Sequence, residues 1–128
     1  MFLKPIFSLK KDVVIGLGEI GVPLYKLLSK SFIVEGYDIN PKLIPKNLKK
    51  NELCPIRFLH ICIPYTKFFN SQILKLVKKF HPQGIVIHST IKPSTTSSIQ
   101  RKLPIPVIYS ATRGVHKRML KDLRRYTK

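Results

Sequence analysis

The chain has 128 residues, a length typical of one domain. Its 24 Lys and Arg against 6 Asp and Glu give a formal net charge of +18, which attracts anions such as nucleotides, phosphorylated sugars and nucleic acid. No apolar run approaches the roughly 20 residues of a membrane span, and two cysteines exclude a disulfide framework, so we expect a cytoplasmic protein with no membrane partner.

Short apolar runs rich in Val and Ile alternate along the chain with stretches of helical period. Residues 1–11 predict an N-terminal arm and not a signal peptide, because a lysine and a proline break the apolar run and no small-residue cleavage site follows. Asp12–Ile15 predicts a strand buried on both faces, and Ile20–Lys30 predicts a helix with Pro23 in its first turn. Pro41–Asn51 is a basic connection with room for one helical turn. The remaining predicted strands are Phe32–Asp38, Arg57–Ile63, Gly84–His88 and Pro106–Ser110, and the remaining helices are Thr66–Phe80, Ser94–Leu103 and Lys117–Tyr126.

This alternation predicts an α/β fold, a Rossmann-type doubly wound and mostly parallel sheet with helices on both faces. We expect residues 1–128 to form a single domain, with 111–128 as a basic C-terminal loop and helix. No second substrate domain is expected in this chain.

A glycine turn directly follows the first predicted strand and opens the first predicted helix. Gly16, Gly18 and Gly21 fit the pattern G-x-G-x-x-G, which is weak alone and gains weight from this context. Gly16 permits the tight turn, Gly18 lets a pyrophosphate approach the backbone, and Gly21 lets the helix pack close to the strand. Free N–H groups at the helix start favour the negative charge. The cofactor candidates here are Gly16, Leu17, Gly18, Glu19, Ile20 and Gly21.

An acidic residue ends the second predicted strand, where the glycine pattern expects one. Asp38 lies about 20 residues after the turn, the distance at which a carboxylate accepts hydrogen bonds from the adenosine ribose. Because a carboxylate repels a 2′-phosphate, NAD is favoured over NADP, although Lys42 is near enough to weaken that preference. Ile39 joins Asp38 as a cofactor candidate. The alternative is a connecting turn that binds no ligand, with Asp38 as a strand-end cap.

Three segments, each at a predicted strand end, resemble the 6-phosphogluconate dehydrogenase-like superfamily, and within it most resemble the UDP-glucose/GDP-mannose dehydrogenase family. They are GLGEIG at 16–21, ICIP at 61–64 and HSTIKPSTT at 88–96. The likeness is to the N-terminal NAD-binding domain of those enzymes and covers roughly residues 11–110. It implies a Rossmann fold, NAD as cofactor and oxidoreductase activity.

The resemblance assigns roles to residues at the later strand ends. Cys62, Ile63 and Pro64 would line the nicotinamide side of the cleft, with Cys62 a strand residue and not the catalytic thiol. Ser89 and Thr90 would touch the cofactor, and the Thr90 hydroxyl would help to hold a water or a substrate group. The alternative for these two residues is a helix-capping stretch without a ligand.

The chain departs from the family after the last predicted strand. The sugar-nucleotide dehydrogenases have Asn-Pro-Glu-Phe there, whereas residues 110–116 contain no Glu. Arg113, His116 and Lys117 form a basic cluster that could dock an anionic substrate group, or an ordinary basic loop. No catalytic residue is assigned, and Thr90 and His116 are the weak candidates. No metal-ligand spacing occurs, and a histidine within an apolar strand, His60, is read as a core residue and not as a base.

Three functions remain open on the sequence. The first is an NAD-dependent oxidoreductase acting on a sugar nucleotide or hydroxyacid, with a second copy or a partner chain supplying the substrate domain. The second is a stand-alone module that binds or senses NAD without turnover. The third is a basic protein that contacts nucleic acid unspecifically through its phosphates.

Overall fold

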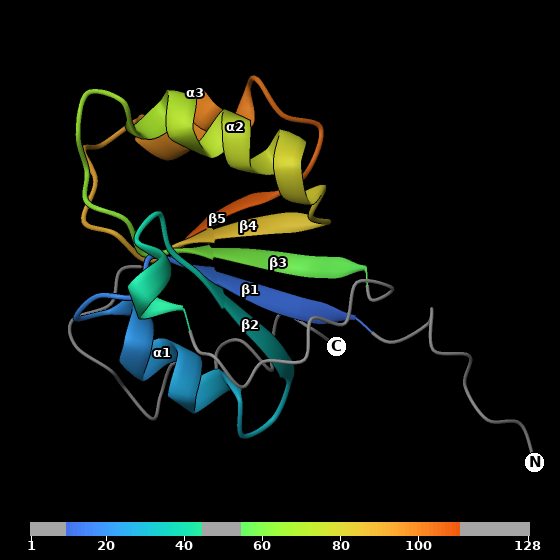
Figure 1. The fold of residues 1–128 in the computed structure, drawn as a ribbon. Coiled ribbons are helices and arrows are strands. Elements are labelled where there is room, and N and C mark those ends of the chain that lie inside the picture. Colours follow the sequence, from blue (N-terminus) through green and yellow to red (C-terminus); the bar gives the residue numbers. More distant parts are fainter. Residues whose placement is uncertain (1–9, 45–54, 111–128) are drawn as a thin grey trace, which may run out of the picture.

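Five parallel strands form one sheet in the computed structural model of the chain, which describes residues 10–44 and 55–110. The strand order is β2-β1-β3-β4-β5, and every neighbouring pair is parallel (Figure 1). The protein therefore has the α/β, Rossmann-like architecture that the alternating sequence pattern predicts. The strands are β1 (Lys11–Ile15), β2 (Ile33–Tyr37), β3 (Ile56–Ile61), β4 (Gly84–Ile87) and β5 (Val107–Tyr109).

Helices cover both faces of the sheet. The helix α1 (Gly21–Leu28) packs on one face, and α2 (Phe69–Phe80) and α3 (Thr95–Gln100) lie together on the other (Figure 1). A short 3₁₀ turn, η2 (Pro41–Leu43), follows β2. Within the described ranges, no helix combines the length and the apolar character that crossing a bilayer requires.

Alternating side chains of the central strands build two apolar cores, one on each face. On the α1 face, Val14 of β1 and Val86 of β4 pack against Leu24 and Leu28 of the helix. On the other face, a larger core joins the three central strands to α2 and α3; its buried members are Val13, Ile15, Ile56, Leu59, Ile61, Phe69, Ile73, Ile85, Ile87 and Ile99. Burial on both faces explains why these strands read as nearly continuous apolar runs.

The predicted elements that fall within the described residues are confirmed, but several of their ends differ. The third helix was expected from Ser94, yet Ser94 has φ 71°, so the helix begins at Thr95. The second helix begins at Phe69 and not at Thr66, whose hydroxyl accepts from the Phe68 amide in the preceding turn. Lys11 was placed in the N-terminal arm but is the first residue of β1, with its ammonium 2.9 Å from Glu35 of β2.

Smaller shifts affect the other predicted ends. The first helix is shorter than the expected Ile20–Lys30, because Ile20 is its N-cap and Ser29 its C-cap. The second strand ends at Tyr37 and not at the expected Asp38, and residues 38–40 separate it from η2, the one helical turn expected within Pro41–Asn51. The helix predicted at Lys117–Tyr126 lies outside the described residues.

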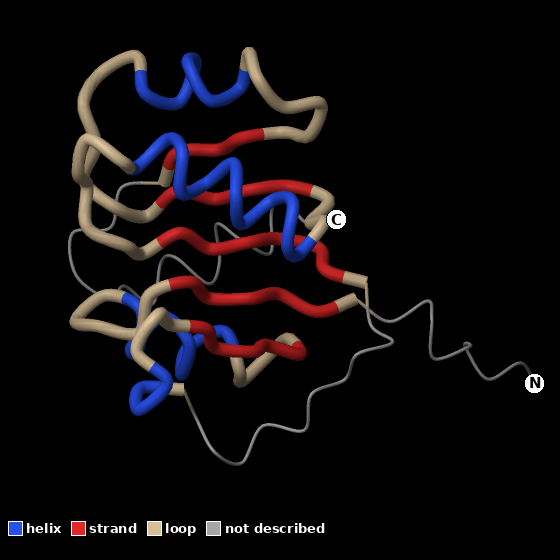
Figure 2. Tube along the Cα trace, turned by 45° about the horizontal axis from the view of Figure 1, so that its top comes forward, coloured by secondary structure: helices blue, strands red, loops and turns tan. Residues whose placement is uncertain are grey.

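The sheet has a topological switch point between β1 and β3. The chain leaves β1 in one direction to reach α1 and leaves β3 in the other direction to reach α2. The loops that follow β1, β3 and β4 meet at the same edge of the sheet (Figure 2). In open α/β sheets, ligands bind in the crevice that this divergence creates outside the carboxyl ends of the strands.

Candidate functional site

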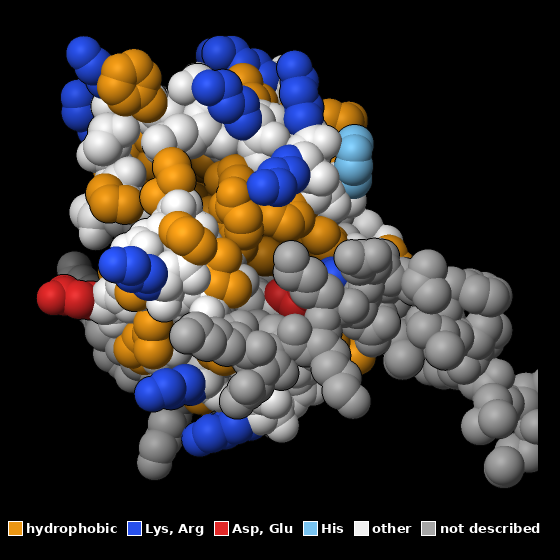
Figure 3. All heavy atoms as spheres, viewed as in Figure 1, with side chains coloured by type: hydrophobic (Ala, Val, Ile, Leu, Met, Phe, Trp, Pro, Cys, Tyr) orange, Lys and Arg blue, Asp and Glu red, His pale blue; other side chains and the backbone are white. Residues whose placement is uncertain are grey.

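A cavity of about 900 Å³ opens at the switch point, between the turn after β1, the end of β2 and the helix α2. Figure 3 shows this region as a hollow with hydrophobic side chains inside it and Lys and Arg side chains around its α2 side. The residues expected to bind the cofactor converge here; only Leu17 and Gly21 of that set do not line the cavity. The lining members are Gly16, Gly18, Glu19, Ile20, Asp38, Ile39, Cys62, Ile63, Pro64, Ser89 and Thr90.

Each glycine of the turn has its own steric environment. Gly16 has φ +94°, and a Cβ there would lie 2.9 Å from the backbone carbonyl of Cys62. A Cβ at Gly21 would overlap the carbonyl oxygen of Gly16, so the helix starts in contact with the turn. A Cβ at Gly18 would meet nothing within 4 Å, because this backbone is open to the cavity. Gly16 and Gly21 are thus required by the fold, whereas Gly18 is not.

The Asp38 carboxylate joins the end of β2 to the glycine turn. One oxygen accepts a hydrogen bond from the Leu17 amide at 2.7 Å, and the other accepts from the Asn40 amide at 2.9 Å. Leu17 itself is buried in the α1 core, so its amide is held in place by its side chain. The carboxylate is therefore fixed at the cavity wall, and the lone pairs that these two bonds leave remain available to a ligand hydroxyl.

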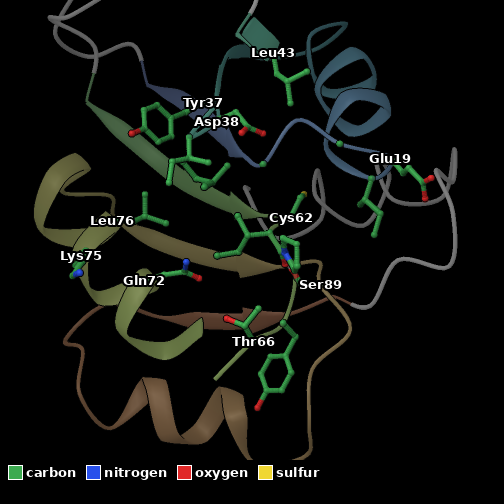
Figure 4. A pocket seen from close by; sticks show the side chains of 18 of the residues that line it. Glu19, Tyr37, Asp38, Leu43, Cys62, Thr66, Gln72, Lys75, Leu76 and Ser89 are labelled. Carbon is green, nitrogen blue, oxygen red and sulfur yellow. The ribbon is translucent and has the colours of Figure 1, made fainter. Parts of the chain in front are cut away.

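The ends of β3 and β4 form the floor of the cavity. Cys62 directly follows β3, and burial raises the pKa of its thiol to about 12, so the sulfur stays protonated at neutral pH. The Ser89 hydroxyl donates to the carbonyl oxygen of Ile63, which ties the two loops together. Thr90 is exposed at the cavity surface. Figure 4 shows Cys62 and Ser89 between Asp38 and Thr66.

The helix α2 supplies a wall that the sequence analysis did not assign to the site. Figure 4 shows Gln72 and Leu76 across the cavity from Asp38. Lys79 donates to the Tyr37 hydroxyl at 3.0 Å, and its ammonium lies 4.4 Å from the centre of that ring. The helical spacing was a usable signal, because these positions recur every three or four residues on a helix that follows the strand whose end the resemblance assigns to the cofactor. The α2 residues that line the cavity are Gln72, Lys75, Leu76 and Lys79.

A buried polar chain crosses three strands on the α1 face. The Asp12 carboxylate forms a bidentate ion pair with Arg57, in which both N···O distances are 2.9 Å. It also lies 2.7 Å from His60 Nε2, and His60 Nδ1 lies 2.9 Å from His88 Nε2. Asp12, His60 and His88 are all at most 1 % exposed. The reading of His60 as a core residue is confirmed, but the chain of contacts around it was missed, because it joins residues up to 48 positions apart.

The surroundings of the buried chain favour the ionised carboxylate of Asp12 and the neutral imidazole of His88. Burial raises the pKa of Asp12, but hydrogen bonds from His60 and Arg57 outweigh that effect and leave the pKa below its usual value. Burial and, to a smaller extent, the neighbouring His60 lower the pKa of His88 to about 3, although a backbone hydrogen bond with Ser110 opposes the shift. Over residues 10–44 and 55–110, no group of three His, Cys, Asp or Glu side chains could hold a metal ion.

The basic cluster expected to dock an anionic substrate, Arg113, His116 and Lys117, lies outside the described residues. Of the two weak catalytic candidates, the structure thus describes only Thr90, which lines the cavity.

The fold and the cavity define an α/β protein with a Rossmann-like sheet and a pocket at its switch point. Comparison of the chain with protein-family models, with curated proteins and with solved structures finds no match.

Proposed function

We propose that the chain binds a dinucleotide, with NAD preferred, in the cavity at the switch point and that it acts as the cofactor-binding domain of an NAD-dependent oxidoreductase. The observation that carries the proposal is the open backbone of Gly18, directly after Leu17, whose amide donates a hydrogen bond to the Asp38 carboxylate. The resemblance of three segments to the sugar-nucleotide dehydrogenases supports the same reading.

The glycine turn offers what a pyrophosphate requires. Gly18 has no side chain between its backbone and the cavity, so phosphate oxygens can reach main-chain N–H groups. The helix α1 begins three residues later, and its N-terminus carries a partial positive charge that favours anions. No acidic side chain occupies the first turn of α1 to compete for those donors.

The other cavity walls fit the two ends of a dinucleotide. Asp38 would accept hydrogen bonds from the adenosine ribose, and its charge disfavours a 2′-phosphate, which supports NAD over NADP. Ile39, which is 92 % exposed, and Leu43 on one wall and Leu76 on the other give apolar surface for the adenine ring. The nicotinamide would then lie toward Cys62.

Gly18→Val tests the proposal. The new side chain meets no protein atom at its Cβ, so the fold should persist while the side chain blocks the phosphates. We expect NAD affinity, measured by calorimetry, to fall at least about tenfold, which corresponds to ~1.4 kcal/mol of binding free energy. Gln83→Val, at an exposed loop position before β4, is the matched control and should leave the affinity unchanged. A Gly18→Val protein that melts normally and binds NAD as the parent does would refute the proposal.

A second candidate, a module that binds NAD without turnover, is favoured by one observation. Among the described residues that line the cavity there is no histidine, and the thiol of Cys62 is protonated at neutral pH. That part of the cavity therefore offers neither an imidazole nor a thiolate as a general base. Tight NAD binding with no hydride transfer on any sugar nucleotide or hydroxyacid would support the module, whereas turnover by the purified chain would support the enzyme.

A further inference from the structure

Acidic and basic side chains are divided unequally between the two halves of the sheet. The acids of the described chain, Asp12, Glu19, Glu35 and Asp38, all lie in the β1-α1-β2 half. The half that runs from β3 to β5 has none, and the sequence contains no Asp or Glu anywhere from 53 to 121. Average composition would place an acid at about one position in eight. A general enrichment in lysine does not explain the missing acids.

Apart from Arg57 of β3, which pairs with Asp12, the cations of that half are exposed and lie on α2, next to α3 or on the loops before these two helices, which share one face of the sheet (Figures 1 and 3). None of them is within ion-pair distance of a carboxylate of the described chain. Lys75, Lys78 and Lys79 lie within one turn of α2, a spacing at which like charges destabilise a helix. The exposed cations, which we call the cationic face, are Lys67, Lys75, Lys78, Lys79, Lys92, Arg101 and Lys102.

A single dinucleotide does not account for this charge. Only Lys75 and Lys79 of the cationic face line the cavity, so the others lie outside the proposed cofactor site. A partner that uses them must carry several anionic groups spread along the face. A phosphate backbone has that form.

Exposed aromatic rings beside these cations point to bases as well as phosphates. Tyr65 and Phe68, which are 37 % and 56 % exposed, lie on the loop between β3 and α2. The Lys67 ammonium lies 5.2 Å from the centre of the Phe68 ring. The Tyr65 hydroxyl lies 3.3 Å from the hydroxyl of Thr95 at the start of α3, a hydrogen-bond distance. Rings set among cations are the combination with which proteins bind single strands, since the rings stack on bases and the cations contact phosphates.

We infer that the cationic face binds single-stranded nucleic acid, with phosphates along α2 and bases on Tyr65 and Phe68. The inference does not rest on the proposed function, but the two sites overlap, because Lys75, Lys79 and Tyr65 also line the cavity. A saturating dinucleotide should therefore compete with the single-stranded nucleic acid and weaken its binding.

Two triple variants of the full chain test the inference. One carries Lys75→Gln, Lys78→Gln and Lys79→Gln; the control carries Lys10→Gln, Lys26→Gln and Lys30→Gln at exposed positions of the acid-containing half. Both lose the same charge. Affinity for a fluorescent oligonucleotide of about 20 nucleotides, longer than one ~4–16-nucleotide site, is measured by anisotropy as salt rises from about 50 to 200 mM.

We expect the α2 variant to bind the oligonucleotide at least about tenfold more weakly at the lower salt concentration. The slope of log affinity against log salt concentration should become shallower by about 2, since each of the three lost phosphate contacts contributes about 0.7. The control should keep the parent slope. Phe68→Ala should weaken binding without changing the slope, because it removes stacking and no charge. Equal losses of affinity in the two triple variants would overturn the inference, since the overall positive charge would then account for the binding without a specific face. Binding to vesicles of anionic lipid but not to the oligonucleotide would also overturn it.

Discussion

Gly16, Gly18 and Gly21 match one motif, but each is glycine for a different reason. Gly16 has a positive φ, Gly21 touches the carbonyl of Gly16, and Gly18 faces open space. The motif can therefore be separated into residues that maintain the fold and one that is free to serve a ligand. Binding and stability should respond to different positions of the same turn.

Alanine at Gly21 and alanine at Gly18 test this separation at the residue scale. Gly21→Ala places a Cβ against backbone, so we expect a loss of about 1–3 kcal/mol in the free energy of unfolding, the range for overpacked sites. Gly18→Ala should stay within about 1 kcal/mol of the parent. Urea unfolding followed by circular dichroism measures both values. Equal destabilisation would show that the turn rearranges, and the steric distinction would then be wrong.

The helix α2 has two unlike sides, and each serves a different part of the molecule. Phe69 and Ile73 are buried in the core above β3 and β4. Gln72, Lys75 and Lys79 face the cavity or solvent. One amphipathic element therefore closes the core and supplies a wall of the candidate site.

Neighbouring alanine substitutions in α2 should have very different costs. Ile73→Ala empties a fully buried position, so we expect about 2–5 kcal/mol of lost stability. Gln72→Ala, one residue away and exposed, should change the free energy of unfolding by less than about 0.5 kcal/mol. Chemical denaturation of both variants gives the comparison. A small cost at Ile73 would mean that the core relaxes into the space, contrary to the close packing described above.

At the scale of the whole molecule, the buried chain of Asp12, His60 and His88 ties β1 and β3 to the end of β4. Its ionisation links folding to pH. The pKa of His88 is about 3 in the folded protein against 6.5 ordinarily, so the unfolded chain takes up a proton first as pH falls. The lowered pKa of Asp12 acts in the same direction below its usual 3.8.

We therefore expect the free energy of unfolding to decrease as pH falls from about 6.5 toward 3, by up to about 1.4 kcal/mol per pH unit for the proton at His88. His88→Gln removes that proton uptake and should flatten the profile in this range. Urea midpoints measured at several pH values test it. A variant with the same acid dependence as the parent would show that His88 does not govern the effect.

The strands, the helices and the glycine turn could be predicted from the sequence, because each depends on local patterns of apolar residues, Gly and Pro. The pairing of the turn with Asp38 was also within reach, since the spacing between them belongs to one strand-helix-strand unit. The helix ends were less accurate. Ser94, for example, favours a helix start by residue type but has a left-handed backbone.

The sequence by itself determined the class of fold, the two apolar faces of the sheet and the absence of acids from 53 to 121. Only the tertiary structure decided that α2 forms a wall of the cavity, that Gly18 alone among the three glycines has free space, and that Asp12 meets His60 and His88. The physical reason is distance along the chain. Local patterns govern which segments become helices and strands, whereas contacts between residues far apart depend on the order in which the strands assemble.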